Sequence, residues 1–177
     1  MECISKFNIP FISTELSKDN QNKIYDIFQN QEKNLKMDDI HSEVYTDFFI
    51  NKDYTLDVIS ILKEDLYNFY SQVGFRNPSI SQAWMQQYTK GCFMTPHNHG
   101  TTGFSSVYYI KFNPKQHEAT RFISPLNNFI TGDNLEYKPK VDQGTLLFFP
   151  SILMHYALPN KSEEPRAILS FNIDEII

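Results

Sequence analysis

The chain has 177 residues, the length of a single domain, and 16 Lys and Arg against 21 Asp and Glu give it a net charge of −5. Its 41% hydrophobic and 15% aromatic residues exclude an intrinsically disordered chain. The acidic balance and the lack of a Lys/Arg cluster argue against a binder of duplex nucleic acid or of a membrane surface. No stretch of about 18 apolar residues is present, and the first residues lack a signal-peptide layout. We therefore expect a cytoplasmic protein in which Cys3 and Cys92 are free thiols.

The first half of the chain has helical periodicity. Residues 16–28 follow a Ser/Thr/Asp-rich start and place Leu16, Ile24, Ile27 and Phe28 on one face. A longer helix is predicted over residues 55–73, where Gly74 ends it. Its apolar stripe comprises Leu56, Ile59, Leu62, Leu66, Phe69, Tyr70 and Val73. The stripe is expected to pack against a sheet.

From residue 81 onward the chain has the pattern of short strands bounded by Gly, Pro and Asn. Strands are predicted at 81–88, 104–112, 120–124, 144–149 and 166–173. In the last of these, apolar residues alternate with Arg166, Ile168, Ser170 and Asn172. The apolar face could lie beneath the helices while the mixed face lines an interior, as in a small β-sandwich or open barrel. No linker divides the chain, so one domain over 1–177 is expected, with a helical support region (1–80) and a β core (81–177).

Two histidines stand two residues apart in Pro96-His97-Asn98-His99-Gly100. In an extended segment both side chains point to one face, with Cα atoms about 6.6–7 Å apart. Two imidazoles at that separation can bind one metal ion as neighbouring ligands. His155, after the apolar run 144–153, could complete a set of three that leaves positions open for substrate and oxygen.

Arg166 lies on the mixed face of the last predicted strand, where a guanidinium that points inward needs an anionic partner. That partner is either the carboxylate of a bound dicarboxylate or a structural Asp or Glu, and residue counting does not separate the two. His41 and His117 lie in polar, loop-like surroundings and are expected at the surface. Asp142 is interpreted as a turn residue. Trp84 is predicted to lie in the core or to wall a substrate entrance, and residues 113–143 to form a lid.

A longer pattern joins these residues. It runs from Tyr88-x-x-Gly91 through His97-x-His99 and Ser106-Val-Tyr-Tyr-Ile110 to Gly144-x-Leu-x-x-Phe-Pro-Ser151, His155, Pro159-Asn160 and Arg166-x-x-x-Ser170-Phe-Asn172. In order and spacing, residues 84–173 resemble the iron(II)/2-oxoglutarate-dependent dioxygenases, especially their prolyl-hydroxylase-like branch and a branch of uncharacterised 2OG-Fe(II) oxygenases.

The resemblance implies a mainly β fold with N-terminal helices, built on a double-stranded β-helix or jelly-roll core. It implies Fe(II) bound by His97, His99 and His155, with 2-oxoglutarate and O₂ as cosubstrates. Arg166 would pair with the distal carboxylate of 2-oxoglutarate, and Tyr109, Tyr88 and Ser170 are further candidates to line that site. The implied reaction hydroxylates a substrate and releases succinate and CO₂. A protein or peptide substrate, such as a prolyl residue, is favoured by analogy.

His99 departs from the resemblance, because most members of the superfamily carry Asp or Glu at that ligand position. Three neutral imidazoles leave Fe²⁺ with a site charge of +2, which a 2-oxoglutarate dianion would neutralise, so the preferred metal is less defined. Two other hypotheses remain open: a three-histidine, cupin-like dioxygenase that works without 2-oxoglutarate, and a non-enzymatic jelly-roll module that binds sugar or serves as a structural part.

Overall fold

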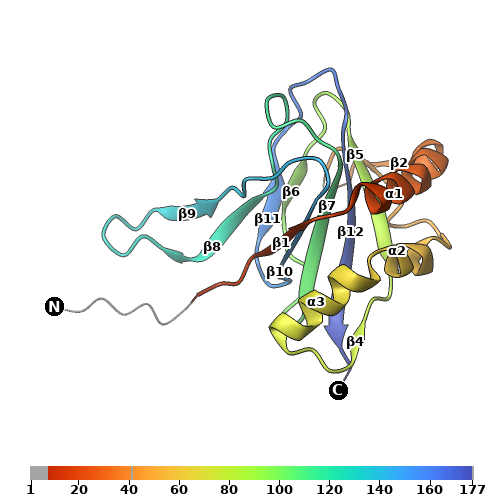
Figure 1. Cartoon of the computed structure of the whole chain (residues 1–177). Coiled ribbons are helices and arrows are strands. Elements are labelled where there is room, and N and C mark those ends of the chain that lie inside the picture. The colour runs from red at the N-terminus through yellow and green to blue at the C-terminus, as the bar shows by residue number, and fades with distance from the viewer. Residues whose placement is uncertain (1–7, 41, 177) are drawn as a thin grey trace.

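The computed structural model describes residues 8–40 and 42–176 and shows two antiparallel sheets with helices on one side (Figure 1). Within these residues the larger sheet has eight strands and the smaller sheet four. In spatial order the larger sheet comprises β1 (Ile12–Glu15), β10 (Thr145–Pro150), β7 (Phe104–Lys111), β12 (Arg166–Glu175), β5 (Ala83–Tyr88), β3 (Val44–Thr46) and β2 (Lys36–Asp38), with β4 (Pro78–Ser79) paired to β12. The smaller comprises β6 (Met94–His97), β11 (His155–Ala157), β8 (Arg121–Asn127) and β9 (Asn134–Tyr137). The expected mainly β architecture is confirmed.

The first predicted helix is confirmed as α1 (Lys18–Gln31), and a short 3-10 helix, η1 (Glu32–Asn34), follows it. Ser17 caps α1, because its Oγ accepts a hydrogen bond from the backbone N–H of Asn20 at 3.2 Å. The cap fixes the start of the helix two residues later than predicted. No helix within the described ranges is long and apolar enough to cross a bilayer.

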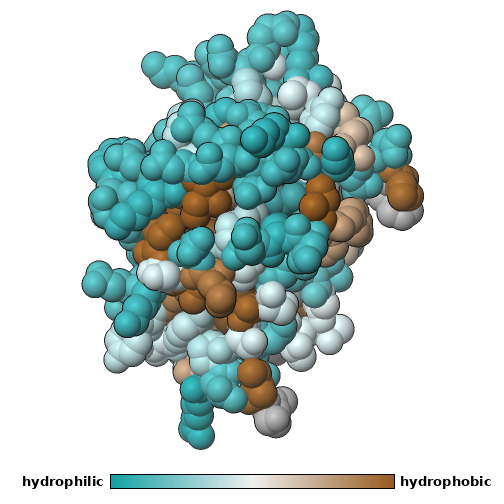
Figure 2. Space-filling model, turned by 90° about the vertical axis from the view of Figure 1, so that its right-hand side faces the viewer, coloured by the Kyte–Doolittle hydropathy of each residue, from teal (hydrophilic) through white to brown (hydrophobic). Residues whose placement is uncertain are grey.

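The second predicted helix is two helices, α2 (Thr55–Ile61) and α3 (Lys63–Val73). The backbone leaves helical geometry at Leu62, where ψ is 7°, so the two segments do not share one continuous apolar stripe. Leu56, predicted to face inward, is 76% exposed, and this assignment was wrong. Gly74 ends α3 with a φ of 82°, as predicted. Figure 2 views the side on which α1 and α2 lie and shows hydrophobic side chains between larger hydrophilic areas.

Two hydrophobic clusters lie on opposite faces of the large sheet. The outer cluster packs Ile24, Phe28 and Phe69 of the helices against Leu169 and Phe171 of β12. The inner cluster lies between the two sheets and includes side chains from both, among them Tyr109, Phe122, Leu147, Phe149 and Ile168. β10 shows the period of two most clearly, because Leu146 and Phe148 enter the outer cluster while Leu147 and Phe149 enter the inner one.

β12 also divides its residues as predicted. Ala167, Leu169, Phe171 and Ile173 enter the outer cluster beneath the helices. Ile168, Ser170 and Asn172 face cavities on the other side of the sheet. The fold therefore uses one strand both to anchor the helices and to line an interior.

Candidate active site

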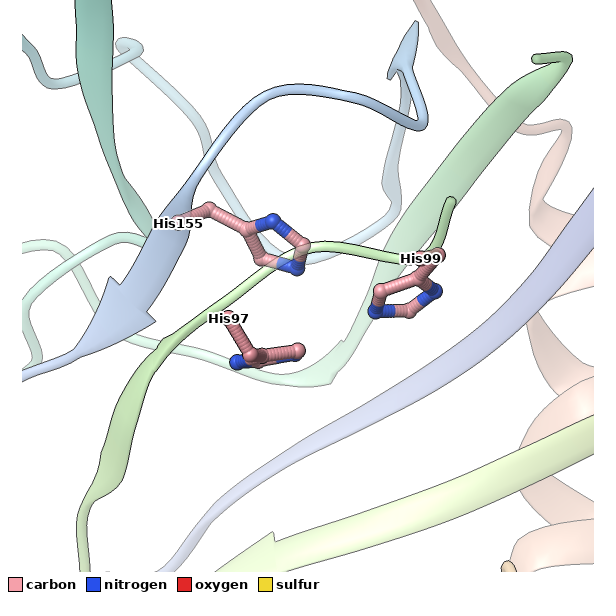
Figure 3. A group of neighbouring side chains, drawn as sticks. All are labelled: His97, His99 and His155. Carbon is pink, nitrogen blue, oxygen red and sulfur yellow. The ribbon is translucent and has the colours of Figure 1, made fainter. Parts of the chain in front are cut away.

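Three histidine rings converge where the small sheet faces the large one (Figure 3). β6 and β11 are antiparallel neighbours in which His97 lies directly opposite His155. His99 follows two residues after β6, where its backbone N–H donates to the carbonyl of Ser151 at 2.9 Å. One potential ligand atom from each ring lies within 4.8 Å of the others. The structure thus brings together the three histidines that the sequence singled out.

Each ring holds its Nδ1 against a carbonyl oxygen. The Nδ1 of His97 lies 2.9 Å from the carbonyl of Thr95, and that of His155 lies 2.9 Å from the carbonyl of Leu153. The Nδ1 of His99 lies 2.7 Å from Oδ1 of Asn172. Because a carbonyl oxygen only accepts, each Nδ1 carries the ring proton and each Nε2 keeps a free lone pair. Three aligned lone pairs are what a metal ion requires.

Burial keeps the three rings neutral. Loss of solvent lowers the pKa of His97 and of His99 below the ordinary histidine range. Burial, together with the neighbouring His97, lowers the pKa of His155 to about 3. The rings therefore do not need to lose a proton to bind a cation at neutral pH. An all-imidazole set of this kind suits Fe, Zn, Cu or Ni, so the residues present fit iron(II).

A small cavity of about 30 Å³ separates the histidines from β12; its lining includes Tyr88, Thr120 and Ser170. Arg166 lies behind this lining and is 3% exposed. Its Nη1 donates to the carbonyl of Glu118 at 2.8 Å and its Nη2 to Oγ1 of Thr120 at 3.3 Å, while its Nε has no partner. The guanidinium lies 4.6 Å from the ring centre of Tyr88.

No Asp or Glu within residues 8–40 and 42–176 forms an ion pair with Arg166. Arg121, by contrast, pairs with Glu118 and Glu136. A buried cation without an anion is costly, and the described residues supply no carboxylate for the ion-pair alternative predicted for Arg166. Because the small cavity has the size of one or two water molecules, a five-carbon dicarboxylate enters only when lining side chains move.

Of the other residues predicted for the cosubstrate, Tyr88 and Tyr109 flank Arg166, while Ser170 lies four residues along β12. Tyr88 and Ser170 line the small cavity. The Tyr88 hydroxyl donates to Oε1 of Gln86 at 3.3 Å, and burial raises the pKa of Tyr88 to about 12. Tyr109 is fully buried, and its hydroxyl accepts from the backbone N–H of Thr120 at 3.3 Å. Tyr109 lies one layer behind the cavity wall, in contact with Thr120 and not on the cavity itself.

A larger cavity of about 360 Å³ opens beside the histidines. Phe48, Phe49 and Trp84 form its aromatic wall, and Gln86 and Asn172 add amide groups. Trp84 lies 5.5 Å from the His99 ring and 5.1 Å from the Phe48 ring, measured between ring centres. The sequence interpretation missed Phe48, Phe49 and Gln86, because two adjacent phenylalanines in a polar segment match no helix or strand pattern. Trp84 walls both cavities, which is the second of its two predicted roles.

Several polar residues differ from expectation. His117, predicted at the surface, is 7% exposed, because its ring accepts from the N–H of Asn113 and bonds the carbonyl of Glu164, joining two loops. His41 and Cys3 lie outside the described residues. Cys92 is a free thiol, as predicted. The predicted lid contains the β8–β9 hairpin, which projects from the body (Figure 1), and residues 124–137 line neither the small nor the large cavity.

The sequence of the chain matches one known protein family. Residues 82–172, more than half of the chain, match the model of a family described as "Putative 2OG-Fe(II) oxygenase". A sequence comparison with the curated proteins finds no significant match.

Among solved structures, the chain is similar to a Pseudomonas putida prolyl-4-hydroxylase, with a TM-score of 0.67 at 13% identity over 96% of this chain and 94% of that one. It is also similar to the viral collagen prolyl hydroxylase of Paramecium Bursaria Chlorella virus-1, with a TM-score of 0.62 at 16% identity over 94% and 96% of the two chains. The epimerase SnoN from nogalamycin biosynthesis gives a TM-score of 0.72 at 12% identity over 94% and 79%.

These likenesses confirm the double-stranded β-helix fold, and the family match extends across every histidine of the triad and Arg166. The chain therefore belongs to the 2OG-Fe(II) oxygenases, the non-haem iron enzymes that use 2-oxoglutarate as cosubstrate.

Proposed function

We propose that this oxygenase binds iron(II) through His97, His99 and His155, binds 2-oxoglutarate through Arg166, and hydroxylates a substrate held in the large cavity. The unpaired guanidinium of Arg166 is the observation that carries the proposal. A buried arginine with a free Nε, one residue layer from three converging imidazoles, fits a ligand with a carboxylate at one end and a metal-binding group at the other. The three-histidine reading without 2-oxoglutarate leaves Arg166 without an anion.

The protein side of the reaction is to bind, orient and exclude water. Iron(II) and 2-oxoglutarate, when bound, supply the oxidative decarboxylation to succinate and CO₂ that accompanies hydroxylation. The Nε2 atoms of the three histidines would hold the metal, and three protein ligands would leave coordination positions for other ligands. Arg166 would fix the distal carboxylate with the hydroxyl of Thr120 beside it, and Ser170 adds a second hydroxyl to the cavity lining. Tyr88 and Tyr109 flank the guanidinium and keep solvent from it, which strengthens its attraction for an anion.

We propose a peptide substrate, with a prolyl residue as the leading candidate. The large cavity has an aromatic wall and amide groups, and neither lysine nor arginine lines it. That lining suits an uncharged ring and its peptide bonds better than a phosphate or another anion. Prolyl hydroxylases are among the structurally similar proteins. The cytoplasm is the proposed site of action, consistent with the free thiol of Cys92.

The test is turnover of proline-containing peptides with Fe(II), 2-oxoglutarate and O₂. The expected result is a peptide product heavier by one oxygen atom, formed with an equal amount of succinate. Arg166→Ala is expected to abolish succinate formation, while the control Arg121→Ala, which changes a partly exposed arginine of β8 in the small sheet, retains it. Oxidised product without succinate would contradict the role of 2-oxoglutarate and support the three-histidine alternative. Succinate formation that no peptide stimulates would contradict the peptide substrate alone.

A further inference from the structure

The three histidines are not oriented in the same way. His97 and His155 each use the backbone carbonyl two residues earlier, so their rings are fixed by the backbone next to them. His99 uses the side chain of Asn172 instead, a residue of β12 that lies 73 positions away. The orientation of one ring of the triad therefore depends on a single distant side chain.

Asn172 is itself fixed by hydrogen bonds on the same oxygen. Its Oδ1 lies 2.7 Å from Nδ1 of His99 and accepts from Oγ of Ser105 at 2.9 Å. Because Ser105 gives its proton to Asn172, the Ser105–Ser151 bond of 2.9 Å must be donated by Ser151. The carbonyl of Ser151 in turn accepts the backbone N–H of His99. These bonds close a ring of contacts that joins β7, β12 and the turn after β10 to His99.

The contact determines which nitrogen of His99 is free. The amide oxygen of Asn172 carries no proton and only accepts, so Nδ1 of His99 must carry the proton. The lone pair is then on Nε2, the atom that faces the other two rings. The amide achieves this without adding charge, so the set remains three neutral imidazoles, whereas an aspartate at this position would place a negative charge against one ligand.

We propose that Asn172 is a positioning residue for the metal site, which fixes the tautomer and ring orientation of His99 through its Oδ1. The inference rests on the proposed function, in which His99 is an iron ligand. A side chain that bonds the remote nitrogen of a metal-binding histidine contributes about 10–100-fold to metal affinity in known sites. Asn172 is expected to contribute within that range, and Ser105 acts by holding Asn172.

The first experiment needs no metal. Nitrogen NMR of metal-free protein with ¹⁵N-labelled histidine, at a pH where the rings are neutral, reports the tautomer of each ring. We expect the Nδ1–H form at His99 in the wild type and in Asn172→Asp, which keeps the acceptor. In Asn172→Ala, His99 loses the acceptor that fixes its Nδ1–H form, so we expect a mixture of its two neutral tautomers. A wild-type His99 in the Nε2–H form would overturn the inference, whatever the variants do.

The second experiment measures affinity for Fe(II) by competition with a chelator under anaerobic conditions. Asn172→Ala is expected to bind 10–100-fold more weakly than the wild type. Asn172→Asp is expected to restore wild-type affinity or exceed it, and the exposed Asn127→Ala serves as the matched control with unchanged affinity. Equal affinity in Asn172→Ala and the wild type would contradict the positioning role. If the wild type binds no metal, the proposed function fails, while the tautomer measurement still decides what Asn172 does.

Discussion

Asp47 lies under the loop that carries the aromatic wall, and its removal is a sharp test of how that loop is held. The residue is 1% exposed. Its Oδ1 accepts from the backbone N–H of Met85 at 2.8 Å and its Oδ2 from the hydroxyl of Tyr54 at 2.6 Å. The Lys52 ammonium lies 3.7 Å from Oδ1, and both side chains of this ion pair are almost fully buried. Asp47→Ala leaves the N–H of Met85 and the hydroxyl of Tyr54 without this acceptor and removes the carboxylate that faces Lys52, whose ammonium keeps its bonds to backbone carbonyls.

The magnitude follows from these contacts. Each hydrogen bond to a charged acceptor contributes about 1.5–3 kcal/mol, so the loss of two costs about 3–6 kcal/mol. Breaking a buried ion pair by removing one partner costs about 3–5 kcal/mol, which agrees. Burial raises the pKa of Tyr54, so its hydroxyl stays neutral near neutral pH and does not replace the lost carboxylate as an anion. A chain of this length should lose about 6–20 °C in Tm.

The assay is urea unfolding of Asp47→Ala beside Asp26→Ala, an exposed aspartate of α1 that serves as control. We expect the free energy of unfolding to fall by about 3–5 kcal/mol in the first and to change by less than about 0.5 kcal/mol in the second. The slope of the free energy of unfolding against urea concentration should be the same in both variants as in the wild type. A loss below about 1 kcal/mol for Asp47→Ala would contradict this prediction, because the buried contacts would then contribute almost nothing.

Three further changes test other parts of the structure. Leu169→Ala, at a fully buried position of the outer cluster, should lower the free energy of unfolding by about 2–5 kcal/mol and leave metal affinity unchanged, by urea unfolding and metal titration. Phe49→Ala should raise the KM for the substrate about tenfold without changing 2-oxoglutarate affinity, because this ring is 78% exposed and lines only the large cavity. Lys138 and Arg121 hold the pKa of Glu118 below its usual range, so this carboxylate stabilises the fold above its unfolded pKa and the effect is lost as pH falls. Glu118→Gln should therefore cost under about 1 kcal/mol at pH 7 and nothing near pH 2, because the pair is partly exposed.

Helices and strands could be predicted from the sequence where the spacing of their apolar residues shows which face is buried. β12 shows apolar residues at every second position because one face packs under helices, and the structure places them there. The spacing of His97 and His99 likewise depends only on an extended backbone. His155 could be singled out because it comes soon after the long strand β10, and Arg166 because it begins the long strand β12; both match a family pattern.

Features that depend on tertiary contacts were not predictable in the same way. β1, β2 and β3 have three or four residues each, too few for a period, and form by pairing with the large sheet. His117 is buried because two distant loops meet on its ring. The role of Asn172 depends on its contact with His99, which is 73 residues away in the sequence. Phe48 and Phe49 line the large cavity because Asp47, next to them, is bound by Tyr54. No local pattern encodes such contacts.

The most direct test of the central claim is anaerobic titration of the Fe(II)-loaded protein with 2-oxoglutarate, followed by the metal-to-ligand charge-transfer absorption. We expect a saturable band in the wild type and in Arg121→Ala. In Arg166→Ala the apparent affinity should fall by at least about 100-fold, because two charge-assisted hydrogen bonds of about 1.5–3 kcal/mol each are lost. Bound iron without a band in the wild type, or equal affinity in Arg166→Ala, would contradict the account.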